Sequence, residues 1–294
     1  MPVAQQHWSE LVRGLANPLP AGRVRAAREL AKLGPAAAGA LPALTAAVED
    51  GDQAVREAAV QAFAALGPTA VAPLVQFLSH SDKYVRRNAT WGLGKLGPHA
   101  RSAMASLCAA LHDPDPRTAS GAAQALGNMG AAAASAVPAL MEALRGTNVV
   151  LCRLAAKALS QIGPAAVPTL LVHLRHHDPF VRGEAAVAVG WIGATAAAAV
   201  PALLEMVRAG TPAPRRTPEP HAYAGSGIGT PIASPQEQEP GGAEETSRLA
   251  AVTALGRIGA AAAEAIPALI AVVEESVEQL RTAAEIALRQ IRGE

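Results

Sequence analysis

The stretch DPFVRGEAAVAVGWIG, residues 178 to 193, begins with an aspartate, continues with apolar residues at helical spacing and ends on a glycine. Related stretches occupy residues 52 to 67 (DQAVREAAVQAFAALG) and 82 to 97 (DKYVRRNATWGLGKLG). The glycines that close such stretches are separated by 33, 30, 33, 33, 30 and 66 residues: Gly34, Gly67, Gly97, Gly130, Gly163, Gly193 and Gly259. A period of 30 to 33 residues predicts an array of similar supersecondary units.

Each unit is predicted to be a helical hairpin. In residues 178 to 193, Val181, Ala185 and Val189 fall on one helical face. Glycine, often followed by proline, ends this first helix, and a second apolar segment such as AVPALMEAL (136 to 144) carries a proline in its first turn. Since such a hairpin cannot bury its apolar face alone, successive hairpins must stack. We therefore predict an all-α fold, a right-handed α-solenoid of about seven antiparallel hairpins with terminal half-units.

The start of the first helix carries a recurring charged pair. An aspartate lies four residues before an arginine in three of the units, and these are Asp52 and Arg56, Asp82 and Arg86, and Asp178 and Arg182. This spacing predicts that the aspartate caps the helix and that stacked units share the pairs as a structural ladder. Arg117 and Arg153 are out of register, which predicts an interrupted ladder in the fourth and fifth units.

The bulk composition excludes several classes of protein. A formal net charge of +1 argues against a strongly basic nucleic-acid surface. Two cysteines, Cys108 and Cys152, are too few for a disulfide framework or a cysteine-based zinc site, and we expect buried free thiols. The N-terminal stretch lacks the pattern of a signal peptide, and no long apolar run is free of proline and charge. The expectation is a cytoplasmic protein that does not contact a membrane.

The pattern VR..A...LG.....AVPAL..AL.D resembles the HEAT repeat, in the short bacterial form similar to the repeats of phycobilisome-lyase-type proteins. The resemblance covers residues 21 to 208 and 246 to 292. It implies the same stacked helical fold. It does not imply one activity, because such solenoids carry unrelated functions.

The period fails in the segment rich in proline, glycine, serine and glutamate that follows the sixth unit. We assign residues 1–209 to an N-terminal helix and six units, 210–245 to an inserted mobile loop, and 246–294 to the last unit with a C-terminal capping helix. The insertion is either tolerated or binds a partner, and Arg215 and Arg216 are then among its contact residues.

Stacking makes equivalent positions neighbours, and two sets of positions stand out. At the end of the second helix, four consecutive units carry His112, Arg145, Arg175 and Arg208. These cations either complement the helix dipole or form a stripe that binds an acidic peptide, phosphate groups or a nucleic-acid backbone.

Two tryptophans form the second set. Trp91 and Trp191 occupy positions of the first helix at which the other units carry mostly polar residues. Each is either covered by a neighbouring element or belongs to a partner interface.

Catalytic patterns are missing from the sequence. The HEAT-repeat deoxyhypusine hydroxylases bind two irons through His-Glu pairs, whereas none of the eight histidines here is followed by glutamate. We predict a non-catalytic protein-binding scaffold or regulatory module that recognises an acidic segment, without cofactor or metal. The alternatives are a HEAT-repeat enzyme or lyase-like subunit, of the oxidoreductase or phycobilin-lyase type, and an anion or nucleic-acid binder.

Overall fold

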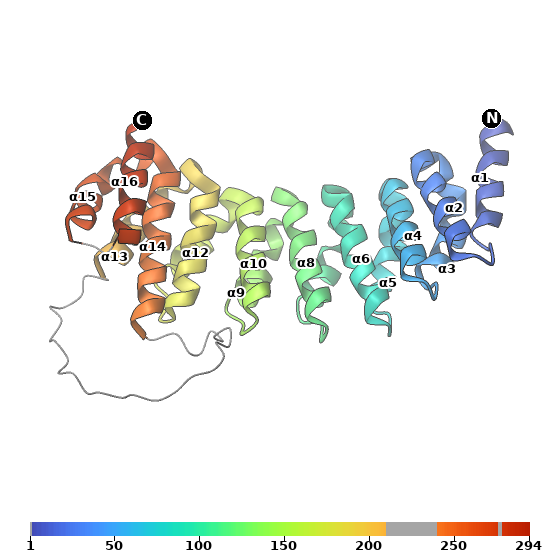
Figure 1. Ribbon diagram of the computed structural model, residues 1–294, viewed down its shortest axis with the longest axis horizontal. Coiled ribbons are helices and arrows are strands. Elements are labelled where there is room, and N and C mark those ends of the chain that lie inside the picture. Colours follow the sequence, from blue (N-terminus) through green and yellow to red (C-terminus); the bar gives the residue numbers. More distant parts are fainter. Residues whose placement is uncertain (1, 210–239, 276–277) are drawn as a thin grey trace, which may run out of the picture. The chain divides into compact units, whose positions relative to one another are not determined.

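Figure 1 shows the computed structural model, which describes residues 2–209, 240–275 and 278–294. Within these ranges, α-helices and short 3-10 helices make up all of the regular secondary structure. The chain divides into two compact units, Met1–Ala166 and Val167–Glu294. The all-α solenoid of stacked helical hairpins that the sequence predicts is confirmed.

Unit 1 begins with α1 (Pro2–Gly14) and continues as hairpins, whose first and second helices we call helix A and helix B. The A helices are α2 (Pro20–Leu33), α4 (Gln53–Ala65), α6 (Lys83–Leu96), α8 (Pro116–Asn128) and α10 (Val149–Ile162). The B helices are α3 (Leu41–Val48), α5 (Val71–Phe77), α7 (Met104–Ala110) and α9 (Val137–Leu144). Each A helix packs beside the next one, as Figure 1 shows for α4, α6, α8 and α10.

The A helices of unit 1 after α2 begin at side-chain caps, whereas α2 follows Leu19 and has none. Asp52 Oδ1 accepts the Ala54 N–H at 2.8 Å, and Asp82 Oδ1 accepts the Tyr84 N–H at the same distance. Asn148 caps α10 in the same way. Each cap satisfies an N–H group that the helix itself leaves unpaired, and contributes about 1 kcal/mol.

Glycine ends the A helices in a backbone conformation that other residues avoid. Gly97 has a φ of 53°, and a Cβ atom added to it would lie 3.2 Å from the Asn128 carbonyl oxygen of the next A helix. Both the positive φ and the close approach therefore require glycine here. Short 3-10 helices follow the A helices: η1 (Gly34–Ala40), η2 (Gly67–Ala70), η3 (Gly97–Ala103), η4 (Gly130–Ala136) and η5 (Gly163–Ala166).

The core of unit 1 lies between the A and B helices and consists mainly of leucine and alanine. Leu30 and Leu93 on A helices, and Leu44, Leu74 and Leu107 on B helices, are fully buried. Burying one such side chain contributes about 2 kcal/mol. Small residues let the A helices approach closely, since a Cβ on Gly127 of α8 would lie 3.0 Å from the Ala158 Cα of α10.

The described part of unit 2 contains the elements α11 (Val167–His173), α12 (Pro179–Ile192), η6 (Gly193–Ala199), α13 (Val200–Ala209), α14 (Pro240–Ile258), η7 (Gly259–Ala265), α15 (Ile266–Glu275) and α16 (Glu278–Arg292). In this part, α12 and α13 form one hairpin and α14 and α15 another, with α11 before them and α16 after them. The helix α14 packs beside α12, so the repeat resumes after the insertion.

The structure moves one predicted boundary. Residues 240–245, which the sequence predicts to be part of the inserted loop, form the first turns of α14. This stretch contains two glycines and two glutamates, a composition that does not indicate a helix. It is helical in the structure because α14 packs on α12. The remaining predicted insertion, residues 210–239, lies outside the described residues.

Two described stretches, Pro179–Ala209 and Gly242–Glu274, are long and apolar enough to cross a membrane by length and composition. Each is interrupted by a 3-10 segment that starts at a glycine with positive φ, Gly193 or Gly259. They are helical hairpins of the repeat, and they contribute buried residues such as Val189, Leu203 and Leu255 to its core.

Candidate functional site

The arginine ladder connects successive repeats, and its pairing differs from the sequence prediction. Arg86 Nε and Nη2 donate to Asp113 Oδ2 and Oδ1 at 2.7 and 2.9 Å, and its Nη1 donates to the His80 and Ser81 carbonyl oxygens. Arg23 makes the same contacts with Asp50. The carboxylate partner is thus the aspartate that lies two residues before the cap of the next A helix, whereas Asp52 and Asp82 cap their own helices through Oδ1.

The carboxylate is missing at one position of unit 1. Arg56 donates to the Asp50 carbonyl oxygen at 2.7 Å and to that of Gly51, but the residue equivalent to Asp50 and Asp113 in the next repeat is His80. The Arg56 Nε is buried and has no hydrogen-bond partner.

The ladder is interrupted further along, as the sequence indicates. Ala119 stands in place of the arginine in α8. The Cys152 thiol takes that place in α10 and lies 3.2 Å from the Gly146 carbonyl oxygen. In unit 2, Arg182 pairs with Glu244 of α14, and Asp178 accepts the Phe180 N–H. The ladder arginines thus vary in their acidic partner.

Two residues of the predicted basic stripe, His112 and Arg175, lie beside glutamate carboxylates. In unit 1, His112 Nε2 lies 3.7 Å from Glu142 Oε1. In unit 2, Arg175 Nε and Nη2 donate to both carboxylate oxygens of Glu205 at 2.8 Å, which lowers the Glu205 pKa. Arg145 and Arg208 are exposed at or near the ends of α9 and α13, while Arg215 and Arg216 lie outside the described residues. The paired members of this set are balanced locally and present less net positive charge to solvent.

A groove runs over the exposed side of the A helices in unit 1. It consists of three adjoining pockets of about 540, 540 and 190 Å³. The first and second pockets share Arg87, Trp91 and Arg117, and the second and third share residues of α8 and α10. We call this surface, lined by side chains of α4, α6, α8 and α10, the A-face groove.

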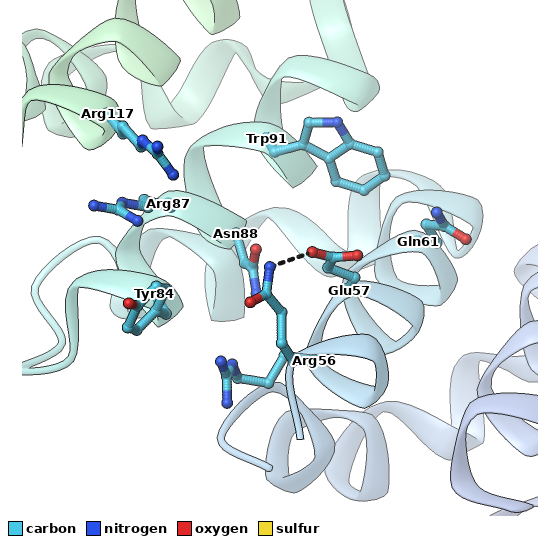
Figure 2. A pocket seen from close by; sticks show the side chains of 9 residues that line it. Arg56, Glu57, Gln61, Tyr84, Arg87, Asn88, Trp91 and Arg117 are labelled. Carbon is cyan, nitrogen blue, oxygen red and sulfur yellow. Dashed lines mark hydrogen bonds between the residues drawn. The ribbon is translucent and has the colours of Figure 1, made fainter. Parts of the chain in front are cut away.

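The A-face groove is basic. Its charged lining residues are Arg56, Arg87, Lys95, Arg117 and Lys157 on the positive side, and Glu57 on the negative side. Glu57 accepts a hydrogen bond from Gln53 at 2.8 Å, the dashed line in Figure 2. A carboxylate or another anion that entered the groove would meet an excess of positive charge.

One of these cations is held rigidly by an ion pair. Arg87 Nε donates to Asp115 Oδ2 at 2.7 Å, and a second bond joins Nη2 to Oδ1. Asp115 is buried and also accepts the backbone N–H and the hydroxyl of Thr118 at 2.8 Å. The hydrogen bonds from Arg87 hold the pKa of Asp115 well below its usual range, against the opposing effect of burial. Arg87 is therefore fixed beside Tyr84.

Two aromatic side chains project from α6 into this surface. Tyr84 and Trp91 are 40% and 41% exposed. Figure 2 shows Tyr84, Arg87 and Arg117 at one end of the first pocket and Trp91 at the other. The Lys95 amine lies 5.2 Å from the Trp91 ring centroid, a cation–π distance. Neighbouring helices leave Trp91 partly open to solvent.

Trp191, in unit 2, is exposed in a similar way. It is 49% exposed on α12, and the Arg257 guanidinium of α14 lies 5.9 Å from its ring centroid. Neighbouring described helices thus leave both tryptophans partly exposed, while the other element that the sequence offers as a cover, the insertion, lies outside the described residues.

The histidines near α12 have structural contacts. His176 Nδ1 accepts the Asp178 N–H at 3.1 Å, and the His173 ring lies 2.9 Å from the Thr169 carbonyl oxygen. Across the described parts of the chain, no group of three or more His, Cys, Asp and Glu side chains is arranged to hold a metal ion. The free thiols differ: Cys152 is buried, whereas Cys108 is half-buried and burial raises its pKa.

Sequence reasoning missed Tyr84, Arg87 and Arg117 as members of one surface. Tyr84 lies two residues before the ladder arginine Arg86, and Arg87 lies one residue after it. Arg117 lies two residues before Ala119, which stands in the place of the ladder arginine in α8. Comparing those positions across all units would have placed them beside Trp91, because equivalent residues of stacked helices are neighbours.

Comparison with known families identifies the repeat. The family described as HEAT repeats matches residues 9–75, 71–156 and 137–218, and the PBS lyase HEAT-like repeat matches residues 247–275. The first match extends over more than half of the chain, and the protein therefore belongs to the HEAT-repeat family.

Solved structures show similarity at low sequence identity. An engineered protein determined by the Northeast Structural Genomics Consortium has 24% identity and a TM-score of 0.41, over 63% of this chain and 96% of its own. A designed armadillo repeat protein in complex with the peptide (KR)4 has 19% identity and a TM-score of 0.43, over 63% and 98%. No curated protein matches the sequence.

Proposed function

We propose that this HEAT-repeat protein is a non-catalytic protein-interaction module, acting as a scaffold or regulatory subunit, and that unit 1 binds an acidic segment of its partner. The observation that carries the proposal is the A-face groove, in which five basic side chains and one carboxylate surround exposed aromatic residues. Aromatic and arginine side chains dominate the binding energy of protein interfaces.

The groove supports this function better than the basic stripe at the B-helix ends. His112 and Arg175 have glutamate neighbours, so an incoming carboxylate would compete with groups already in place. Arg117 and Lys95, in contrast, line the pockets from exposed positions and have no carboxylate partner among the contacts of the described residues. The more favourable position for an acidic segment is therefore beside α6 and α8.

The test uses fluorescein-labelled peptides and the full chain. A peptide of alternating glutamate and serine is compared with one of alternating lysine and serine, by fluorescence anisotropy at low and high salt. We expect saturable binding of the acidic peptide that weakens as salt is added, because exposed charges are screened. The basic peptide should not bind.

Matched charge reversals locate the site. Arg117→Glu combined with Lys95→Glu should weaken binding at least about tenfold, through loss of attraction and added repulsion. Arg101→Glu combined with Arg145→Glu makes the same change in net charge outside the groove and should leave the affinity within about twofold. Unchanged binding by the groove variant, with loss in the other one, would refute the proposed surface.

A further inference from the structure

The A-face groove, in which we place the acidic segment, has a lining at α6 that differs from its lining at every neighbouring repeat. On α6 the positions two before and five after the ladder arginine carry Tyr84 and Trp91. The corresponding residues are Ala54 and Gln61 on α4, Arg117 and Gln124 on α8, and Val150 and Lys157 on α10. The two aromatic side chains are therefore a local feature of α6 and are not required by the repeat.

Positive charge is concentrated around the first of these rings. Arg87 Cζ lies 5.0 Å from the Tyr84 ring centroid, Lys83 Nζ lies 5.4 Å and Arg56 Cζ lies 5.5 Å from it. Arg117 lines the same pocket. Asp115 balances Arg87, and the cluster keeps an excess of positive charge. A carboxylate from outside would lower the electrostatic energy of this cluster.

Trp91 provides an apolar contact at the other end of the same pocket. Its ring lines both large pockets and is 41% exposed, so it is open to contact with a segment that passes from one pocket to the other. Burying this surface against a large apolar side chain would be favourable, and aromatic pairs add about 1 kcal/mol to the area effect.

The spacing of the two contacts sets the spacing of the ligand. Seven residues of α-helix separate Tyr84 from Trp91, which corresponds to roughly 10 Å along the axis of α6. An extended chain covers that distance in about three residues. The two contacts thus match an acidic residue and an apolar residue that are about three positions apart.

We propose that Tyr84, Arg87, Trp91 and Arg117 form a specificity subsite for an extended partner segment in which an acidic residue precedes or follows a large aromatic residue by about three positions. This inference rests on the proposed function, since it names the residue pattern that the acidic segment carries. The acidic side chain lies among the cations beside Tyr84, and the aromatic side chain packs on Trp91.

A variant with a single tryptophan reports on the subsite directly. The chain has three tryptophans, so Trp8→Phe with Trp191→Phe leaves Trp91 as the only indole. The probes are short blocked peptides: Glu-Glu-Ser-Gly-Phe flanked by serines, the same peptide with alanine for phenylalanine, and a third with lysines for the glutamates. Trp91 fluorescence and the affinity of each peptide are measured together.

We expect the Glu-Glu-Ser-Gly-Phe peptide to bind at least about tenfold more tightly than the alanine peptide, and to change the Trp91 emission. In the otherwise natural chain, Trp91→Ala should remove this preference, whereas Trp191→Ala, the matched control, should preserve it. Equal binding of the phenylalanine and alanine peptides, with an unchanged Trp91 signal, would overturn the subsite and leave acidic recognition standing. Failure of every glutamate peptide to bind would overturn the proposed function and the subsite together.

Discussion

The two junctions that α6 makes with its neighbours share a core but differ in their charged contacts. Toward α8, Arg86 pairs with Asp113 and Arg87 pairs with Asp115. Toward α4, Arg56 meets a repeat with His80 at the equivalent position, and its buried Nε has no partner.

Both junctions contain fully buried leucines, so apolar packing contributes to the stacking of the hairpins at each of them. The ion pairs have another effect, because they hold specific charged side chains in one orientation. That effect is strongest at the α6–α8 junction, where Arg87 lines the A-face groove. The proposed binding surface extends over both junctions, since α4, α6 and α8 all line its first pocket. The comparison indicates that the ion pairs fix its α6–α8 side and that the α4–α6 junction is the weaker point of the ladder.

The largest effect is expected from breaking the paired junction at Asp115. Asp115→Ala removes the partner of Arg87 and the cap of α8 at once. Because the pair is largely buried, unit 1 should lose about 3 kcal/mol of unfolding free energy, measured by urea titration with circular dichroism. Asp82→Ala, which removes a cap without a buried pair, should cost about 1 kcal/mol. Equal losses in the two variants would contradict the distinction between the junctions.

Acid should weaken the paired junction next. The pKa of Asp115 is lowered in the folded protein, chiefly by the hydrogen bonds from Arg87, so the unfolded chain binds a proton at higher pH than the folded one. Its contribution is complete above the usual aspartate pKa of about 4 and is lost progressively as the pH falls below that value. Asp115→Asn should therefore flatten the decline of stability between about pH 5 and pH 2, followed by urea unfolding across that range. An unchanged pH profile would show that this pair does not contribute.

A smaller gain is expected from completing the unpaired junction. His80→Asp places a carboxylate where Asp50 and Asp113 stand in their repeats, and where it can accept from the Asp82 N–H as His80 Nδ1 does. Pairing with Arg56 should satisfy its Nε and stabilise unit 1 by about 1 kcal/mol in the same titration. In the double variant with Arg56→Lys, which lacks the second donor nitrogen, most of the gain should disappear. A loss of stability in the single variant would show that the two repeats are not equivalent here.

The sequence predicts the fold of this protein well, because the period of the capping glycines and the helical spacing of apolar residues have one structural solution. Asp52 and Asp82 also cap their helices as their positions before the apolar runs indicate. The partners of the arginines were not predictable in the same way. They depend on which side chain of the next repeat reaches Arg86 or Arg56, and local spacing in one helix does not contain that information.

The candidate site was predicted only in part. Trp91 and Trp191 occupy positions at which the other repeats carry mostly polar residues, and both are exposed. The A-face groove was not predicted, because its basic residues occupy different positions in different repeats. They lie close together only through the stacking of α4, α6, α8 and α10.

The most direct test of the central claim is to map where an acidic peptide contacts unit 1 of the intact protein. Amide chemical shifts of the full chain are recorded by NMR with and without the glutamate–serine peptide. We expect the perturbations to concentrate at Tyr84, Arg87, Trp91 and Arg117, and to be absent in the Arg117→Glu and Lys95→Glu double variant. Perturbations centred on His112 and Arg145 at the B-helix ends would contradict the central claim.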